Sequence, residues 1–103
     1  VMGVACALFE EGINDRKTGV LLNANFGQYR TASALDLPEI VAFNVEAEDP
    51  YFAYSAKGGG ESSNASTHAA IRNAVCHALG VWIYELPLTP DKILNALAKK
   101  TSD

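Results

Sequence analysis

The chain has 103 residues, of which 49% are hydrophobic and 19% charged, a balance typical of one small globular domain and not of a disordered chain. Its formal net charge of −4 argues against nucleic acid as a partner, because the 8 Lys and Arg residues form no basic stripe. No apolar run approaches the roughly 20 residues that a membrane-spanning helix needs.

The two cysteines, Cys6 and Cys76, lie far apart in the sequence and form no C-x-x-C motif. Neither clusters with His68 or His77, so the sequence predicts no metal or iron–sulfur site within this chain. Buried free thiols are the favoured interpretation. Free thiols are typical of a reducing compartment, so we expect a cytoplasmic protein.

The first predicted element is a helix over residues 1–11, apolar on nearly every side and therefore expected to be buried, with Gly12 just after its end. The chain starts at Val1 inside this pattern and without a capping residue, which suggests a fragment or a helix packed against another chain. Residues 14–19 form a turn cluster. Residues 20–22 with Ile13 then predict a short hairpin.

The next predicted element is a strand over residues 40–45, which are rich in β-branched and aromatic side chains. Val41, Phe43 and Val45 fall on one face of it. Pro38 favours extended geometry at Leu37, just before the strand. Three acids and a proline over residues 46–50 end the strand and predict a solvated turn, with cation binding as the less favoured alternative.

Two helices are predicted in the last third of the chain. Apolar residues at three- and four-residue steps predict a helix from about residue 66 to 79, closed by Gly80, and a short extended apolar run follows over 81–84. The N-cap candidates of the first helix are Ser63, Asn64 and Ser66. Thr89 as N-cap and Pro90 at the first helical position predict the last helix. Its expected apolar stripe comprises Ile93, Leu94 and Leu97, and residues 101–103 are an expected frayed tail. The mixture predicts an α+β fold.

The stretch with the clearest chemical content is A-K-G-G-G-E-S-S, residues 56–63. Gly58, Gly59 and Gly60 permit backbone conformations and close approaches that a Cβ would prevent. Lys57 precedes them, and the carboxylate of Glu61 follows just before a helical pattern. This order indicates a loop that holds an oxyanion-rich cofactor beside a proton acceptor, with a flexible surface loop as the alternative.

The order of these features resembles the C-terminal segment of the molybdopterin-binding (large) subunit of the xanthine dehydrogenase / aldehyde oxidoreductase family of molybdenum hydroxylases. Residues 3–11 resemble that family's buried helix with its A-L-x-E-E ending, and residues 25–40 its N-F-x-x-Y…D-x-P-E-I segment. Residues 56–61 are similar to its A-K-G-x-G-E loop. Residues 69–80 and 86–94 match its closing helix, L-P-x-T-P turn and last helix. The resemblance covers essentially the whole chain, residues 1–103, as a single segment of a molybdopterin-binding domain.

The resemblance implies an oxidoreductase that hydroxylates an aldehyde, an N-heterocycle or a purine with water-derived oxygen. It implies that Glu61 is the base that deprotonates a molybdenum-bound hydroxyl, and that Gly58, Gly59 and Gly60 bring bare backbone to the cofactor. The implied cofactor is molybdopterin, with its nucleotide form left open. [2Fe–2S] clusters and FAD are expected in other domains or subunits. The expected partners are the rest of the molybdopterin subunit, those domains and a small-molecule substrate.

Several alternatives stay open at this point. Ser62 and Ser63 stand where the family usually has two prolines, and Ala32 where many members have proline, which leaves the substrate class open. Lys57 either shapes the loop, pairs with an acid or contacts the cofactor. A serine–lysine amidohydrolase loop is less favoured because glycines do not separate the serines. A Walker loop fails because Lys57 precedes the glycines. The main rival is a stand-alone structural or interaction fragment without activity of its own.

Overall fold

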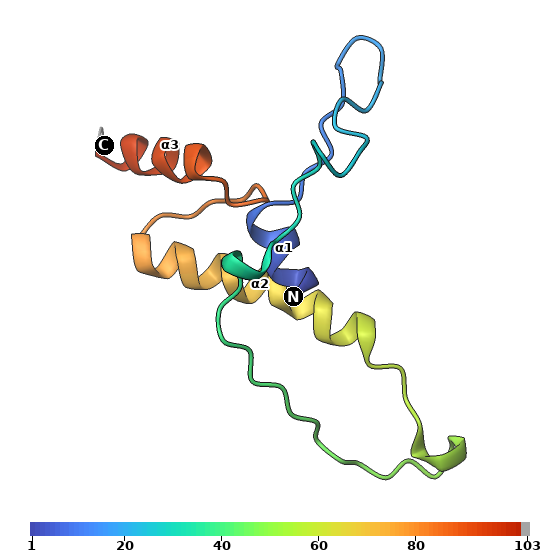
Figure 1. Cartoon of the computed structure of the whole chain (residues 1–103). Coiled ribbons are helices and arrows are strands. Elements are labelled where there is room, and N and C mark those ends of the chain that lie inside the picture. Colours follow the sequence, from blue (N-terminus) through green and yellow to red (C-terminus); the bar gives the residue numbers. More distant parts are fainter. Residues whose placement is uncertain (102–103) are drawn as a thin grey trace.

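Three α-helices form the framework of residues 1–101, which a computed structural model describes (Figure 1). They are α1 (Met2–Leu8), α2 (Gly60–Leu79) and α3 (Pro90–Lys100), and two 3₁₀ turns, η1 (Ala34–Asp36) and η2 (Ala53–Ser55), lie between α1 and α2. Ser102 and Asp103 of the expected tail lie outside the described residues. No helix among the described residues is long and apolar enough to cross a membrane.

The helix α1 packs across the middle of α2 through small residues (Figure 1). Its buried residues are Gly3, Ala5 and Ala7. The expectation of a helix over residues 1–11 buried on every side is wrong, because α1 ends at Leu8 and Met2 is 67% exposed. At its end, the Leu88 N–H donates to the Ala7 carbonyl at 2.7 Å and satisfies one of the carbonyls that a helix C-terminus leaves free.

A small core joins the C-terminal half of α2 to the following linker and to α3. Its buried members are Cys76, Ile83 and Leu88, and the partly buried residues around them are Leu8, Ile71, Val75, Leu79, Val81, Ile93 and Ala96. Arg72 fixes the linker by donating from Nε to the Ile83 carbonyl. Its guanidinium also lies 5.4 Å and 5.0 Å from the ring centroids of Trp82 and Tyr84. The predicted extended run over 81–84 is therefore held by side chains and not by strand pairing.

The predicted burial of the thiols and the predicted apolar stripe of α3 are confirmed only in part. Cys76 is 3% exposed, whereas Cys6 is half-buried, and both cysteines are free. In α3 the start at Thr89 and Pro90 is confirmed. The expected stripe is shifted, because Leu94 is 65% exposed while Ile93 and Ala96 pack against the core.

The helix α2 begins six residues before its predicted start and ends where predicted, with Gly80 in the left-handed conformation (φ 64°). Its N-cap is Gly59, so Ser63, Asn64 and Ser66 are not caps. The hydroxyl of Ser63 donates to the carbonyls of Gly59 and Gly60 at 2.9 and 3.0 Å. The Thr67 hydroxyl donates to the Ser63 carbonyl in the same way, at 2.9 Å. Hydroxyls that bond back to the preceding turn do not cap backbone N–H groups, and the helix extends past them.

Residues 12–30 form an arm that projects from α1 (Figure 1). The predicted hairpin is present there as a single antiparallel bridge between Asn14 and Leu21, and not as paired strands. Asn23, 7% exposed, closes the base of the arm: its side chain accepts from the Ile13 N–H at 2.9 Å and donates to the Glu11 carbonyl at 2.7 Å. The hydroxyl of Tyr29 donates to Glu10 at 3.0 Å and attaches the arm to the end of α1.

The turn η1 follows the arm and is closed by a capping box. The backbone N–H and the hydroxyl of Ser33 donate to the Asp36 carboxylate at 2.9 and 2.7 Å. These hydrogen bonds, with a smaller contribution from the nearby charge of Arg30, hold the pKa of Asp36 below its ordinary value.

Residues 37–59 form a wide loop that runs from η1 out to η2 and back to the start of α2 (Figure 1). The predicted strand over 40–45 lies in this loop as extended backbone without a partner among residues 1–101. The helical part of the predicted α+β fold is therefore confirmed, and its strands are absent from the described residues. The loop and the arm expand the molecule to a radius of gyration of 17.9 Å, against about 13 Å for a compact domain of this size.

Candidate functional site

Glu61 lies in the first turn of α2, one residue after the helix begins, and its side chain is exposed. The positive end of the α2 helix dipole therefore lies beside Glu61, and this position favours a negatively charged carboxylate. Because α2 is contacted by α1 in its middle and by the small core at its other end, Glu61 lies on a helix that is anchored at two places.

The three glycines before Glu61 have no function in the packing of the described residues. A Cβ added at Gly58, Gly59 or Gly60 would meet no atom within 4 Å. None of the three has a positive φ, so the backbone conformation does not require glycine either. The three glycines therefore leave bare backbone that another group could approach closely.

The N-terminus of α2 is also open to a ligand. No side chain of the described residues caps it. The hydroxyl of Ser62 donates to the Gly59 carbonyl at 3.3 Å, and that of Ser63 is engaged with the same turn, so both serines turn away from the N–H groups. Backbone N–H groups at a helix N-terminus are donors suited to anionic or oxygen-rich ligands.

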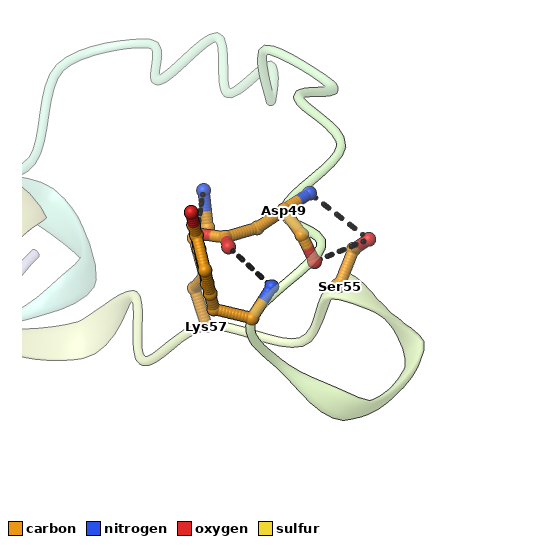
Figure 2. A network of polar contacts seen from close by, with 4 residues as sticks. Asp49, Ser55 and Lys57 are labelled. Carbon is orange, nitrogen blue, oxygen red and sulfur yellow. Dashed lines mark hydrogen bonds and ion pairs between the residues drawn. The ribbon is translucent and has the colours of Figure 1, made fainter.

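The start of the glycine loop is held by a set of polar contacts between Asp49, Ser55 and Lys57, which we call the clip (Figure 2). The Lys57 ammonium lies 3.1 Å from the Asp49 carboxylate. The Ser55 hydroxyl accepts from the Asp49 N–H at 3.1 Å and donates to the Asp49 carbonyl at 3.4 Å. The clip closes residues 49–57 into a loop and so fixes the point from which the three glycines start.

The backbone inside the clip has two strained residues. Tyr54 and Ser55 have φ values of 57° and 54°, a region that side-chain-bearing residues adopt at a cost of about 1–3 kcal/mol each. Tyr54 is fully exposed, so packing does not hold it there. The contacts of Ser55 and Lys57 with Asp49, together with backbone hydrogen bonds such as Ser55 N–H to the Phe52 carbonyl, hold the loop in this conformation.

Of the residues singled out from the sequence, those of the glycine loop lie together and the two histidines lie apart from them. Lys57, the glycines and Glu61 are consecutive and lie at the helix start, whereas His68 is half-buried on α2 and His77 is exposed two turns further along. The pairing of Lys57 with Asp49 was one of the open alternatives. The contribution of Ser55 was not predicted, and only a serine between an acid-proline turn and a lysine could have indicated it. Because Lys57 pairs with Asp49 and the serines bond to carbonyls, no serine–lysine nucleophile forms among the described residues.

A cleft of about 630 Å³ lies elsewhere, between residues 80–85 and the face of α3 that carries Lys92 and Lys99. It begins where α2 ends, and a helix of 20 residues is about 30 Å long, so this cleft is not part of the environment of Glu61. No group of three or more His, Cys, Asp or Glu side chains suited to a metal ion occurs within residues 1–101.

Comparison with known proteins identifies the family. The xanthine dehydrogenase molybdenum-binding subunit of Escherichia coli O157:H7 is 46% identical over 92 residues, which are 89% of this chain and 12% of that protein. The aldehyde oxidoreductase molybdenum-binding subunit PaoC of Escherichia coli K12 is 34% identical over 97 residues, 93% of this chain and 13% of that protein. The chain belongs to the xanthine dehydrogenase / aldehyde oxidoreductase family of molybdenum-binding subunits.

The fold agrees with this family. The crystal structure of quinoline 2-oxidoreductase from Pseudomonas putida 86 superposes with a TM-score of 0.79 at 33% identity, over 94% of this chain and 13% of that chain. No protein-family model matches the sequence. The chain spans about an eighth of the length of the curated relatives it matches, 12–13% in the two proteins above.

Proposed function

We propose that this chain contributes Glu61 as the base of a molybdenum hydroxylase site that other polypeptide completes. The reaction is the hydroxylation of an aldehyde, an N-heterocycle or a purine: a substrate C–H and water give C–OH, two protons and two electrons. When bound, molybdopterin supplies the two-electron oxidation and the delivery of water-derived oxygen. The chain's own contribution is to accept one of the two protons at a Glu61 carboxylate oxygen.

The observation that carries the proposal is the coincidence of an exposed carboxylate, three unneeded glycines and an uncapped helix start within residues 58–63. Without side chains, Gly58, Gly59 and Gly60 let a bulky cofactor approach the backbone. The free N–H groups at the start of α2 are donors for its oxygen atoms. The residues present therefore fit a molybdopterin on this side of the loop.

In this proposal the clip positions Glu61. The ion pair between Lys57 and Asp49 fixes one end of the glycine loop, and α2 fixes the other. A base acts only when it lies within hydrogen-bond reach of the proton, so both anchors matter for the rate. Lys57 acts through Glu61 and is a positioning residue rather than a catalytic one.

The rest of the site belongs to other polypeptide in this proposal. The chain exposes 8454 Å², whereas a folded protein of 11.0 kDa exposes about 5,600 Å². Phe26, Phe43 and Tyr51 are among the large apolar side chains that are more than 80% exposed. We expect this surface to contact the remainder of a molybdopterin subunit, with [2Fe–2S] and flavin domains carrying the electrons away. An isolated chain is then an interaction segment without activity, and this surface supports that view of it.

The test is the Glu61→Gln variant in the assembled, cofactor-loaded enzyme. Gln keeps the shape of the side chain but accepts no proton, so turnover should fall at least about 100-fold while molybdenum content stays unchanged. Glu85→Gln is the matched control, because Glu85 is exposed in the linker beyond the other end of α2. Turnover of Glu61→Gln within a few-fold of the wild type would refute the assignment.

A further inference from the structure

Residues 40–45 have the β-branched and aromatic side chains typical of a β-strand, and all six residues are exposed. Val41, Phe43 and Val45 alternate along extended backbone and are 79%, 84% and 85% exposed. Side chains two residues apart lie on one face of a strand, so these three present one continuous apolar row. Asn44 is the polar residue between the last two and falls on the opposite face.

The backbone of this segment is unpaired as well. Within residues 1–101, no N–H or carbonyl of residues 37–48 takes part in a hydrogen bond. An extended stretch with a free backbone edge and an apolar row has the properties of a strand that pairs with the edge of a sheet in another polypeptide.

We propose that residues 40–45 form a β-strand that adds to a sheet edge in the polypeptide that makes up the rest of the molybdenum-binding subunit. This inference rests on the part of the proposed function that assigns the rest of the site to other polypeptide. The matched relatives contain about eight times the length of this chain, of which it covers 12–13%, so polypeptide of the required size is present in the family.

A second copy of this chain does not suit the segment. Glu39 lies immediately before it, and Glu46 and Glu48 lie after it. An antiparallel pair of copies centred on residues 42 and 43 places Glu39 opposite Glu46, and a parallel in-register pair places each acid beside itself. Like charges directly opposite one another destabilise a sheet. The partner strand therefore has apolar residues facing Val41 and Phe43 and neutral or basic residues beside the acids.

Pairing of residues 40–45 with the other polypeptide would also help to position Glu61. The segment ends four residues before Asp49, which belongs to the clip with Lys57. A sheet that holds residues 40–45 in place fixes the outgoing limb of the loop that returns to the start of α2 (Figure 1). Glu61 is then positioned from both sides once the chain is assembled.

The experiment is amide hydrogen exchange of residues 40–45, measured by mass spectrometry in the isolated chain and in the assembled molybdenum-binding subunit. We expect exchange at least about tenfold slower in the assembly, with residues 71–79 of α2 protected in both samples. Equally fast exchange of residues 40–45 in both samples would overturn the proposal. Protection in the isolated chain that rises with its concentration would also overturn it and would indicate a second copy as the partner.

Two variants test whether the apolar row of Val41, Phe43 and Val45 makes the contact. Phe43→Asp places a charge in the apolar row and should weaken association of this chain with the remaining polypeptide at least about tenfold. Asn44→Asp adds the same charge one residue away on the other face and should change association less than about threefold. Equal effects of the two variants would contradict strand pairing through the apolar row. Exchange in Glu61→Gln should match the wild type, so an error in the base assignment leaves this result unchanged.

Discussion

Replacing Gly3 by alanine should destabilise the chain, because Gly3 of α1 is buried against Thr67 of α2 without room for a side chain. An alanine Cβ there would lie 2.5 Å from the Thr67 Cβ and 2.8 Å from its Cγ2. Carbon atoms in contact normally stay about 3.5–4.0 Å apart, so the methyl group intrudes by about 1 Å. Rotating Thr67 does not relieve the clash, since its Cβ is fixed by the backbone and its hydroxyl is bonded to the Ser63 carbonyl at 2.9 Å.

Two effects of opposite sign decide the magnitude. Overpacking of this kind costs about 1–3 kcal/mol. Alanine favours a helix interior over glycine by about 0.8–1.0 kcal/mol, and less in the first turn, where Gly3 lies. The clash is the larger effect, and we expect a net loss of about 1–2 kcal/mol. For a domain of this size the loss lowers the melting temperature by about 5–15 °C.

Thermal unfolding followed by far-UV circular dichroism measures this loss. Gly12→Ala is the matched control, because a Cβ at Gly12 would have Leu21 Cδ1 at an ordinary 3.5 Å as its nearest neighbour. We expect its stability within about 0.5 kcal/mol of the wild type. A Gly3→Ala variant as stable as the wild type would refute the close α1–α2 packing and, with it, the anchoring of α2.

Further predictions concern the clip and the capping box. The Lys57–Asp49 pair is half-exposed, so Lys57→Met should lower stability by less than about 1 kcal/mol, yet turnover of the assembled enzyme should fall clearly. If the two residues act as one clip, Lys57→Met and Asp49→Asn together should reduce turnover no more than either alone, and additive losses would contradict this. The lowered pKa of Asp36 means that its capping box contributes stability above the ordinary Asp pKa of about 3.9, which is lost as the pH falls through the lower folded value. An NMR titration of Asp36 with a midpoint at or above the ordinary value would refute those hydrogen bonds.

The helices could be predicted from the sequence because local signals specify them. Thr89, Pro90 and Gly80 punctuate the chain where helices begin or end, and each acts through its own backbone geometry. The strand over 40–45 could not be confirmed in the same way, because a strand needs a partner and no described residue supplies one. The early start of α2 escaped prediction because Ser63 uses its hydroxyl to bond back to Gly59, whereas the sequence pattern indicates a cap.

The residues of the candidate site were proposed from the sequence, whereas the contacts that support the loop were not. Glu61 and the glycines are adjacent in the sequence, so the family motif was sufficient to select them. Asp49 supports the loop by contacting Ser55, six residues later, and Lys57, eight residues later. Ser55, which makes the first contact, has a left-handed backbone. No periodicity reports such a contact, and it required the three-dimensional structure.

The central claim is that Glu61 accepts a proton during hydroxylation, and the most direct measurement is the single-turnover rate of cofactor reduction by saturating substrate. Saturation removes differences in substrate binding, so the rate reports the step in which the proton is lost. For Glu61→Gln with full molybdenum content, the account predicts a rate at least about 100-fold below that of the wild type. A rate within a few-fold of the wild type would contradict it.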